Sequence, residues 1–190
     1  MANKRYVSYD DMNAMLNKMY RDMANDGYKP DVVVGLVRGG AIPAVHFSHY
    51  FDTPMVAFKY SLRDHPGADD ISKLTDLLTR SDINILIVDD ICDEGHTLHE
   101  VYQKLEEKMA EIRATEIAEC EILTAEAKAA AAPGEDWNSY EVDLSRFDIK
   151  NFKTAVLQHN LGATLFEPDY CGEEINKVEK PEWIVYPFEY

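Results

Sequence analysis

The segment ILIVDDICDEGHTL, residues 85–98, joins a strongly apolar run to carboxylates, a glycine and a threonine. We expect a buried strand that delivers Asp89 and Asp90 to its carboxyl end, followed by a turn that opens a helix at Thr97. Gly95 lets the backbone come close to a ligand, and the successive N–H groups at the helix start suit a phosphate. The paired carboxylates cannot hold that phosphate, but they suit a ribose diol or a divalent cation. The segment therefore predicts a site for a sugar phosphate.

An acidic junction between a strand and a loop, with a glycine-containing helix cap, is the alternative interpretation of this segment. An Asp-Asp pair alone is weak evidence against it. The complete pattern is specific, because four apolar residues, Asp-Asp, and then Asp, Gly and Thr at positions 93, 95 and 97 are needed together. We favour a functional site on that ground.

A polar cluster follows each apolar segment of the chain. Together with residues 89–97, these clusters lie at residues 38–40, 59–64 and 159–160. If the apolar segments are parallel strands, these clusters meet at one edge of the sheet, where ligands bind in such folds. Their coincidence predicts a single active site.

The elements that must position these clusters alternate along the chain. Helices are expected after Ser8, through Val45 and Tyr50, and after Thr97; strands are expected at 31–36, 55–60, 83–90 and 152–160. Such alternation indicates βαβ units with right-handed crossovers. The predicted fold class is α/β, a doubly wound and mostly parallel sheet with helices on both faces.

Composition excludes several classes of protein. The 190 residues carry a formal net charge of −16 and are 46% hydrophobic, so we expect one globular domain, 1–190, that binds neither nucleic acid nor an anionic membrane. Three scattered cysteines form no disulfide framework and no zinc spacing, which favours a reducing, cytoplasmic location. We expect no signal peptide, because the first residues, MANKRYVSYDD, have no apolar core, and no membrane span, because no apolar run approaches about 20 residues.

Residues 106–148 are the most acidic stretch, with 12 acidic and four basic residues. Their net charge of −8 is half that of the chain. The segment EAKAAAAPGED indicates the end of an Ala-rich helix before Pro133 and Gly134. We interpret the stretch as a solvated insertion; an oligomer contact is the alternative.

Three segments resemble the type I phosphoribosyltransferases. ILIVDDICDEGHTL resembles their signature for phosphoribosyl pyrophosphate (PRPP), and GLVRGG (35–40) resembles their pyrophosphate loop. EWIVYPFE (182–189) resembles the hood of the xanthine-guanine and hypoxanthine members. The resemblance extends from about Asp31 to Tyr190. It implies a core of about 1–160 with an insertion at about 113–148, and a hood at about 161–190.

The resemblance implies a role for each residue on the phosphate side. Asp89 and Asp90 would face the ribose hydroxyls and Mg²⁺. The 5′-phosphate would be held by Asp93, Glu94, Gly95, His96 and Thr97. Pyrophosphate would be held by Val37, Arg38, Gly39 and Gly40, in a loop that often contains a cis non-proline bond, with Lys59 and Arg63 as further candidates. A solvated side chain is the alternative for those last two. Glu94 stands where the family commonly has Thr, so its carboxylate must point outward.

On the base side, the resemblance gives Asp93 a second role as the acceptor of the base's proton. Trp183 would stack on a purine and the Ile184 region would offer backbone carbonyls; a core Trp in a C-terminal hairpin is the alternative. In 6-oxopurine members a Lys commonly follows the strand that matches AVLQHN. Here His159 and Asn160 stand there, and each can donate a hydrogen bond.

The resemblance thus implies an Mg²⁺-dependent enzyme of nucleotide salvage. It would make a nucleoside monophosphate and pyrophosphate from PRPP and a nucleobase, with a 6-oxopurine favoured, as a homodimer or higher homo-oligomer. The alternative is a PRPP- or nucleotide-sensing regulatory protein of the same fold without turnover. An unrelated doubly wound domain with an acidic metal pocket does not account for Arg38-Gly39-Gly40 or the phosphate site.

Overall fold

The computed structural model describes residues 3–60, 74, 77, 83–131, 141, 152–162 and 165–189. Two compact units divide the chain between them. The first comprises Met1–Asp69, Ile83–Tyr102 and Lys150–Tyr190, and the second comprises Asp70–Asp82 and Gln103–Ile149. All predicted site residues belong to the first unit.

The elements follow one another in the order β1 (Asn3–Tyr6), α1 (Tyr9–Asn25), β2 (Val32–Val37), α2 (Ala41–Phe51), β3 (Met55–Lys59), β4 (Ile85–Cys92), α4 (His96–Ala130), β5 (Phe152–Asn160), β6 (Tyr170–Ile175) and β7 (Glu182–Val185). The fold is α/β, as the alternation of the sequence predicts. The four expected strands correspond to β2, β3, β4 and β5.

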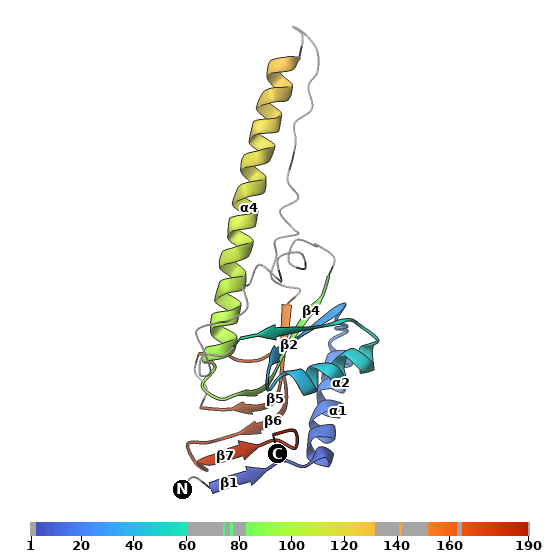
Figure 1. Ribbon diagram of the computed structural model, residues 1–190, viewed down its shortest axis with the longest axis vertical. Coiled ribbons are helices and arrows are strands. Elements are labelled where there is room, and N and C mark those ends of the chain that lie inside the picture. Colours follow the sequence, from blue (N-terminus) through green and yellow to red (C-terminus); the bar gives the residue numbers. More distant parts are fainter. Residues whose placement is uncertain are drawn as a thin grey trace. The chain divides into compact units, whose positions relative to one another are not determined.

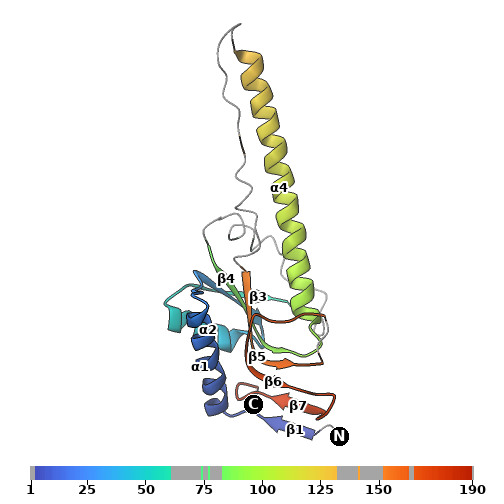
Figure 2. The same cartoon turned by 180° about the vertical axis from the view of Figure 1, so that it is seen from behind.

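The main sheet has five parallel strands in the order β3-β2-β4-β5-β6. Figure 2 shows the last two, β5 and β6, side by side. The chain enters the sheet at β2, adds β3 on one side, and then returns to add β4 on the other. Strand order therefore reverses between β2 and β4. Ligands of open α/β sheets bind beyond the carboxyl ends of the strands at such a switch point. The segments that follow β2 and β4 are the two loops singled out by the sequence.

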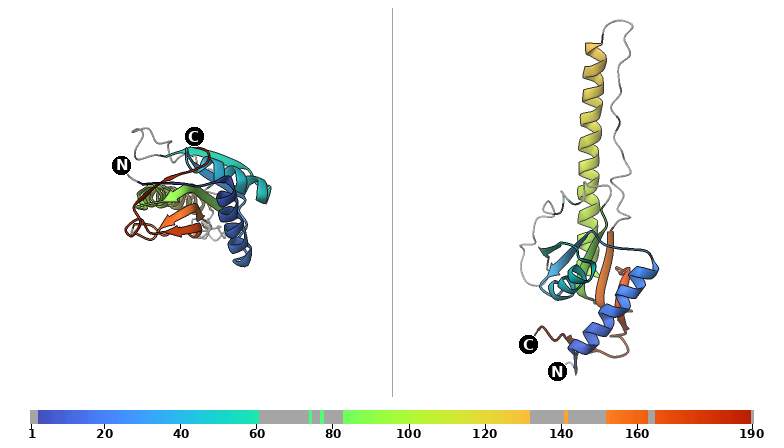
Figure 3. Two further views of the ribbon diagram at one scale, coloured as in Figure 1. Left: turned by 90° about the horizontal axis from the view of Figure 1, so that it is seen from below. Right: turned by 90° about the vertical axis from the view of Figure 1, so that its right-hand side faces the viewer.

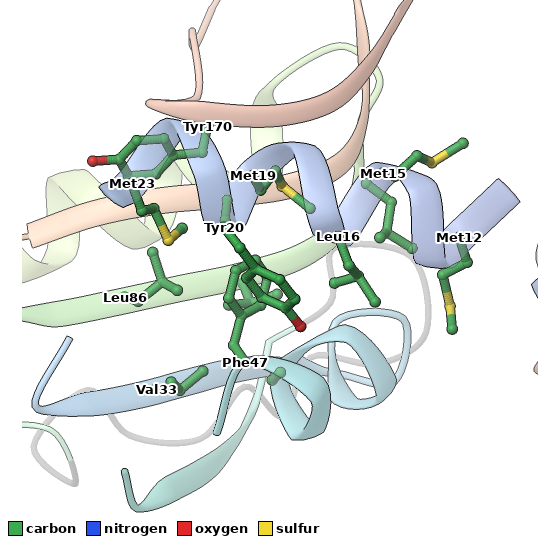
Figure 4. Close-up of a cluster of buried hydrophobic side chains, with 14 of the residues drawn as sticks. Met12, Met15, Leu16, Met19, Tyr20, Met23, Val33, Phe47, Leu86 and Tyr170 are labelled. Carbon is green, nitrogen blue, oxygen red and sulfur yellow. The ribbon is translucent and has the colours of Figure 1, made fainter. Parts of the chain in front are cut away.

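One face of this sheet carries the main hydrophobic core, formed with α1 and α2 (Figure 4). Met12, Met19 and Met23 of α1 are fully buried, so the methionine stripe is core packing. The ring of Tyr20 in α1 meets Phe47 of α2 edge-on, with centroids 5.3 Å apart, which places both helices on the same face. Helix α1 also packs on β5 and β6 (Figure 3).

Helix α1 begins as the sequence predicts. Ser8 is its N-cap: the Ser8 hydroxyl accepts from the Asp11 N–H at 3.1 Å, and the Asp11 carboxylate accepts from the Ser8 N–H at 3.0 Å. This reciprocal pair satisfies two N–H groups that the helix itself cannot satisfy.

Three strands were not expected from the sequence. Strand β6 extends the main sheet, and β1 pairs in parallel with β7 to make a separate two-stranded sheet beside the chain ends (Figure 1). The pairing of β7 with β1 replaces the C-terminal hairpin that was considered for this region. Trp183 on β7 is 52% exposed and is not a core residue.

Within the second unit, α4 continues from Gln103 and ends at Ala130, just before the predicted stop at Pro133. Leu105 and Met109 are buried, whereas Ile122 and Leu123 further along are exposed. The acidic stretch thus begins inside one continuous helix. Among the helices that the structure describes, none combines the length and the apolarity that a membrane crossing demands.

Candidate active site

The first loop of the site lies between β2 and α2. The peptide bond joining Val37 and Arg38 is cis, which is the feature that the resemblance implies for this loop. Gly40 is the N-cap of α2, and its N–H donates to the carbonyl of Leu36 at 2.8 Å. The chain therefore turns sharply from the strand into the helix, with the Arg38 side chain exposed.

Glycine is required in this loop because the backbone lies directly against β4. A methyl group on Gly39 would overlap the carboxylate of Asp90, and one on Gly40 would overlap the carbonyl oxygen of Val88. The first loop is thus in contact with the strand that carries the acidic pair.

The Asp89–Asp90 pair lies inside β4 rather than at its end, because the strand continues to Cys92 through pairing with β5. Asp89 Oδ1 accepts from the Asp90 N–H, and Asp90 Oδ1 accepts from the Ile91 N–H, both at 2.9 Å. Burial, reinforced by the charge of Asp90, raises the pKa of Asp89 well above its ordinary value; burial also raises the pKa of Asp90. A cation or hydroxyl groups placed here would relieve this cost.

The second loop runs from Asp93 into the start of α4. Gly95 has a φ of 85°, and a methyl group on it would come within 2.8 Å of the Phe166 nitrogen. A residue with a side chain is therefore unfavourable at this position for two reasons: the positive φ of the turn and the close approach of Phe166. The Glu94 side chain is 74% exposed and its carboxylate lies 3.5 Å from His96 Nε2, so it points outward, as a phosphate in this loop requires.

These loops border one cavity of about 800 Å³. The residues of the prediction that line it are Val37, Arg38, Gly39, Asp89, Asp90, Asp93, Glu94, Gly95, His96, Thr97, Trp183 and Ile184. The volume suits a ligand of nucleotide size. Four further predicted residues are described but do not line the cavity: Gly40, Lys59, His159 and Asn160. Arg63 lies outside the described residues.

Asn160 does not face the cavity because both ends of its carboxamide bind other parts of the chain. Its Nδ2 donates to the carbonyl oxygen and to Oδ1 of Asp93, at 3.0 and 3.2 Å. Its Oδ1 accepts from the N–H groups of Gly162 and Lys177, at 3.2 and 3.0 Å. The side chain expected to contact a base instead ties three segments of the chain together.

Lys177 is a site residue that the sequence analysis missed. It lines the cavity, and its Nζ lies 2.7 Å from Oδ2 of Asp93. The lysine follows β6 in a turn that has no motif of its own, and the two charges are 84 residues apart in sequence. Nothing in the local sequence separates it from a solvated lysine.

His159 is buried as the partner of Cys92 in the β4–β5 ladder, and its Nε2 has no hydrogen-bond partner among the described residues. Cys92 is buried as well. Burial, with the charges of Asp89 and Asp93, raises the pKa of the Cys92 thiol to about 11, so the thiol stays protonated at neutral pH. Cys92 borders the cavity, but its side chain is 2% exposed and protonated, whereas His159 does not line the cavity.

A chain of hydrogen-bonded polar groups leads from Arg5 and Glu173, which are partly exposed, to the backbone of the acidic pair. Arg5 Nη2 donates to both carboxylate oxygens of Glu173 at 2.8 Å, and Glu173 accepts from Gln158 Nε2 at 2.6 Å. The Tyr186 hydroxyl lies 3.0 Å from Gln158 Oε1 and 3.0 Å from the Asp90 carbonyl oxygen. Tyr186 is buried, and its hydroxyl also anchors the backbone of the acidic pair.

A family profile described as "Phosphoribosyl transferase domain" matches residues 6–159. A search among curated proteins finds no match. A purine phosphoribosyltransferase from Pyrococcus horikoshii has a similar structure, with a TM-score of 0.58, 22% identity, and 98% of this chain and 95% of the other covered.

Two further solved structures are comparable. The Helicobacter pylori xanthine-guanine-hypoxanthine phosphoribosyltransferase gives a TM-score of 0.56 at 18% identity, covering 98% of this chain and 94% of the other. A hypothetical protein from Neisseria gonorrhoeae with bound ppGpp gives 0.59 at 18% identity, covering 100% and 91%. At these identities the likeness establishes the fold.

Proposed function

Because the chain belongs to the phosphoribosyltransferase family, we propose that it transfers the phosphoribosyl group of PRPP to the ring nitrogen of a 6-oxopurine in nucleotide salvage. The products are a nucleoside monophosphate and pyrophosphate. The observation that carries the proposal is the shared cavity, which brings the predicted pyrophosphate loop, the acidic pair and the hood aromatic together from three distant segments.

On the phosphate side, backbone amides do most of the binding. The N–H groups at the start of α4 and the Thr97 hydroxyl hold the 5′-phosphate, with the positive end of the helix dipole behind them. The loop at Val37–Gly40 holds the pyrophosphate group through its amides, with Arg38 as the charged partner. The overall acidity of the protein is no obstacle, because these donors are local.

The acidic pair fits a magnesium ion that arrives with its substrate. Two hard oxygen ligands line the cavity, and no group of three or more His, Cys, Asp or Glu side chains suited to a metal occurs in the described part of the chain. Mg²⁺ is commonly held by one or two carboxylates together with substrate phosphates and water. When bound, the ion supplies positive charge that stabilises the leaving pyrophosphate.

The reaction breaks the bond between the anomeric carbon and the pyrophosphate oxygen, whose electron pair leaves with pyrophosphate. The base nitrogen supplies the electrons of the new bond, and its proton passes to the Asp93 carboxylate. Trp183, half exposed at the cavity, stacks on the ring, and the Ile184 backbone binds its edge. Arg38 and the α4 amides stabilise charge on the two phosphate-bearing fragments.

A pyrophosphate-release assay with PRPP and Mg²⁺ tests this proposal against xanthine, guanine, hypoxanthine, adenine, uracil, orotate and nicotinamide. The expected result is release that depends on the base and is fastest with an oxopurine. If none of these bases supports pyrophosphate release, the proposal is overturned.

A nucleotide-sensing role is the second candidate, and the ppGpp bound to the Neisseria structure favours it. A sensor would keep the phosphate sites and bind PRPP or a nucleotide without turnover. Calorimetric binding of PRPP together with the absence of release in the assay above would select this alternative.

A further inference from the structure

The backbone around Asp90 is held by hydrogen bonds on both of its flanking peptide groups. The Asp90 N–H donates to Asp89 Oδ1, and the Ile91 N–H donates to Asp90 Oδ1, both at 2.9 Å. The Asp90 carbonyl oxygen lies 3.0 Å from the Tyr186 hydroxyl. The carbonyl of Asp90 and the N–H of Ile91 belong to one peptide group, which is planar. A hydroxyl that holds this carbonyl therefore also orients the N–H that holds the Asp90 carboxylate.

The Tyr186 hydroxyl is a buried donor with two acceptors. Tyr186 is 2% exposed, and its hydroxyl lies 3.0 Å from Gln158 Oε1 as well as from the Asp90 carbonyl oxygen. A hydroxyl has a single proton, which it can give to either oxygen or share between them. Its removal takes this donor away from both oxygens, and buried acceptors that lose a donor are costly. The position of the Asp90 peptide group is therefore sensitive to this one hydroxyl.

The amide of Gln158 is oriented by an ion pair on its other side. Gln158 is 0% exposed, and its Nε2 donates to Glu173 Oε2 at 2.6 Å. Arg5 Nη2 donates to both oxygens of the same carboxylate at 2.8 Å. Because a carboxylate paired with a guanidinium only accepts, the amide nitrogen of Gln158 must face Glu173, and Oε1 then faces Tyr186. Side chains of β1, β6 and β5 thus lead to one hydroxyl beside β4.

Only the inner end of this chain reaches the cavity. Tyr186 and Asp90 line the cavity, whereas Gln158, Glu173 and Arg5 do not. The Asp90 carboxylate also lies against the first loop, since a methyl group on Gly39 would overlap it. Any effect of the outer residues on a ligand must therefore pass through Tyr186 and the Asp90 backbone.

We propose that Tyr186 is a positioning residue: its hydroxyl fixes the peptide group between Asp90 and Ile91, and thereby sets the Asp90 carboxylate for the hydroxyl groups of a bound ribose. Gln158, Glu173 and Arg5 hold the Tyr186 hydroxyl in place and extend this support to β1. The inference rests on the proposed function, in which the ribose of PRPP or of the product nucleotide lies beside the acidic pair.

Inosine monophosphate and its 2′,3′-dideoxy analogue provide the test, because the analogue lacks the two hydroxyls that the acidic pair would bind. Calorimetry in the presence of EDTA measures both affinities without metal and without turnover. We expect wild type to bind inosine monophosphate at least about tenfold more tightly than the analogue. Tyr186→Phe should lower this ratio at least about threefold, through weaker binding of inosine monophosphate alone. A general loss of structure would weaken both ligands and leave the ratio unchanged.

Tyr28→Phe is the matched control for the lost hydroxyl. The Tyr28 hydroxyl is also buried, but it has no hydrogen-bond partner among the described residues, and Tyr28 does not line the cavity. Its ratio should equal that of wild type. A wild-type ratio in Tyr186→Phe, or an equal fall in Tyr28→Phe, would overturn the inference.

Arg5→Met tests the outer end of the chain. Without the guanidinium, Glu173 loses the contacts that orient it toward Gln158, so the ratio should fall at least about twofold, and less in Arg5→Lys. Added to Tyr186→Phe, Arg5→Met should lower the ratio no further, because it acts through the same hydroxyl. An unchanged ratio in Arg5→Met, or a further fall in the double variant, would refute the role of Arg5.

Lys153→Met is the control for the broken ion pair. Lys153 pairs with Asp169 at 2.6 Å, with side chains 37% and 30% exposed, against 34% and 34% for Arg5 and Glu173. Asp169 binds Thr154 and not the chain that leads to Asp90. Lys153→Met should therefore keep the wild-type ratio, and a fall equal to that of Arg5→Met would refute the specific role of Arg5.

Turnover separates this inference from the proposed function. If wild type prefers inosine monophosphate to the analogue but releases no pyrophosphate with any base, the transferase is refuted, and the ratios of the variants still decide the inference. If wild type binds the two ligands equally, or binds neither, the acidic pair does not hold the ribose and the inference is refuted.

Discussion

The phosphate side and the base side of the cavity are built in different ways. The proposed phosphate side consists of two contiguous loops that would bind through backbone groups, at the ends of neighbouring strands β2 and β4. The base side is assembled by side chains from the β4 loop, the end of β5 and the turn after β6, joined by hydrogen bonds of Asn160.

Because of this difference, we expect substitutions on the two sides of the cavity to have different effects. The phosphate-side loop tolerates few substitutions, because an added methyl group at Gly39 or Gly40 would overlap β4. On the base side, single side chains can be replaced without moving the backbone. We therefore expect changes on the phosphate side to affect every base equally, and changes on the base side to affect selectivity.

The largest effect is expected for Asp93→Asn, which removes the proton acceptor. We expect kcat to fall by about 10²–10⁴, the usual contribution of a positioned base, while PRPP binding is retained. Single-turnover kinetics and PRPP titration measure the two quantities. Unchanged turnover would remove Asp93 from the chemistry.

Arg38→Ala tests the phosphate side. Loss of a charge-assisted hydrogen bond costs about 1.5–3 kcal/mol, so PRPP and pyrophosphate should bind about 10–100 times more weakly. A nucleoside monophosphate has no pyrophosphate group and should bind as before. Equal losses for all three ligands would mean that the loop has been assigned the wrong ligand group.

Trp183→Ala should weaken base and nucleotide binding through lost stacking, by about 1–3 kcal/mol. The free energy of unfolding should change little, because the side chain is 52% exposed. Fluorescence titration and urea unfolding measure the two. A large loss of stability with normal nucleotide affinity would restore the packing interpretation.

The smallest effect is expected for Asp89→Asn, and the quantity that changes is the free energy of unfolding. Because burial raises the pKa of folded Asp89 above its unfolded value near 3.8, the folded protein holds the proton more tightly, and stability falls as pH rises through that window. Asp89→Asn keeps the acceptor for the Asp90 N–H and removes the buried charge.

We expect Asp89→Asn to raise the free energy of unfolding at neutral pH by about 0.5–2 kcal/mol while activity is lost. The gain should shrink as pH falls toward 3.8. Urea unfolding at pH 8 and pH 5 gives the comparison. A variant less stable than wild type at pH 8 would show that the acidic pair carries no electrostatic cost.

Strands with an apolar, β-branched core could be predicted from the sequence, and so could the capped start of α1. The segments that make β1 and β6 could not. NKRY is polar and YCGEEI contains two acids, so neither carries the apolar signal of a strand, and both form only through pairing with distant partners. Tertiary pairing of this kind overrides local propensity.

Within the site, the residues that the sequence predicted in contiguous loops line the cavity, all but Gly40, whereas those predicted from single positions mostly do not. Sequence reasoning placed the end of β4 at Asp90, where the apolar run gives way to carboxylates; the ladder with β5 continues to Cys92. It assigned Asn160 to the base and overlooked Lys177. No local pattern shows which way an amide points or which lysine returns to the cavity.

The most direct measurement is steady-state pyrophosphate release with PRPP and hypoxanthine both varied, for wild type, Arg38→Ala and Trp183→Ala. We expect release that requires the base, a KM for PRPP that rises about tenfold or more in Arg38→Ala alone, and a KM for hypoxanthine that rises similarly in Trp183→Ala alone. Release without a base, or equal changes of both constants in both variants, would contradict a site divided into a phosphate side and a base side.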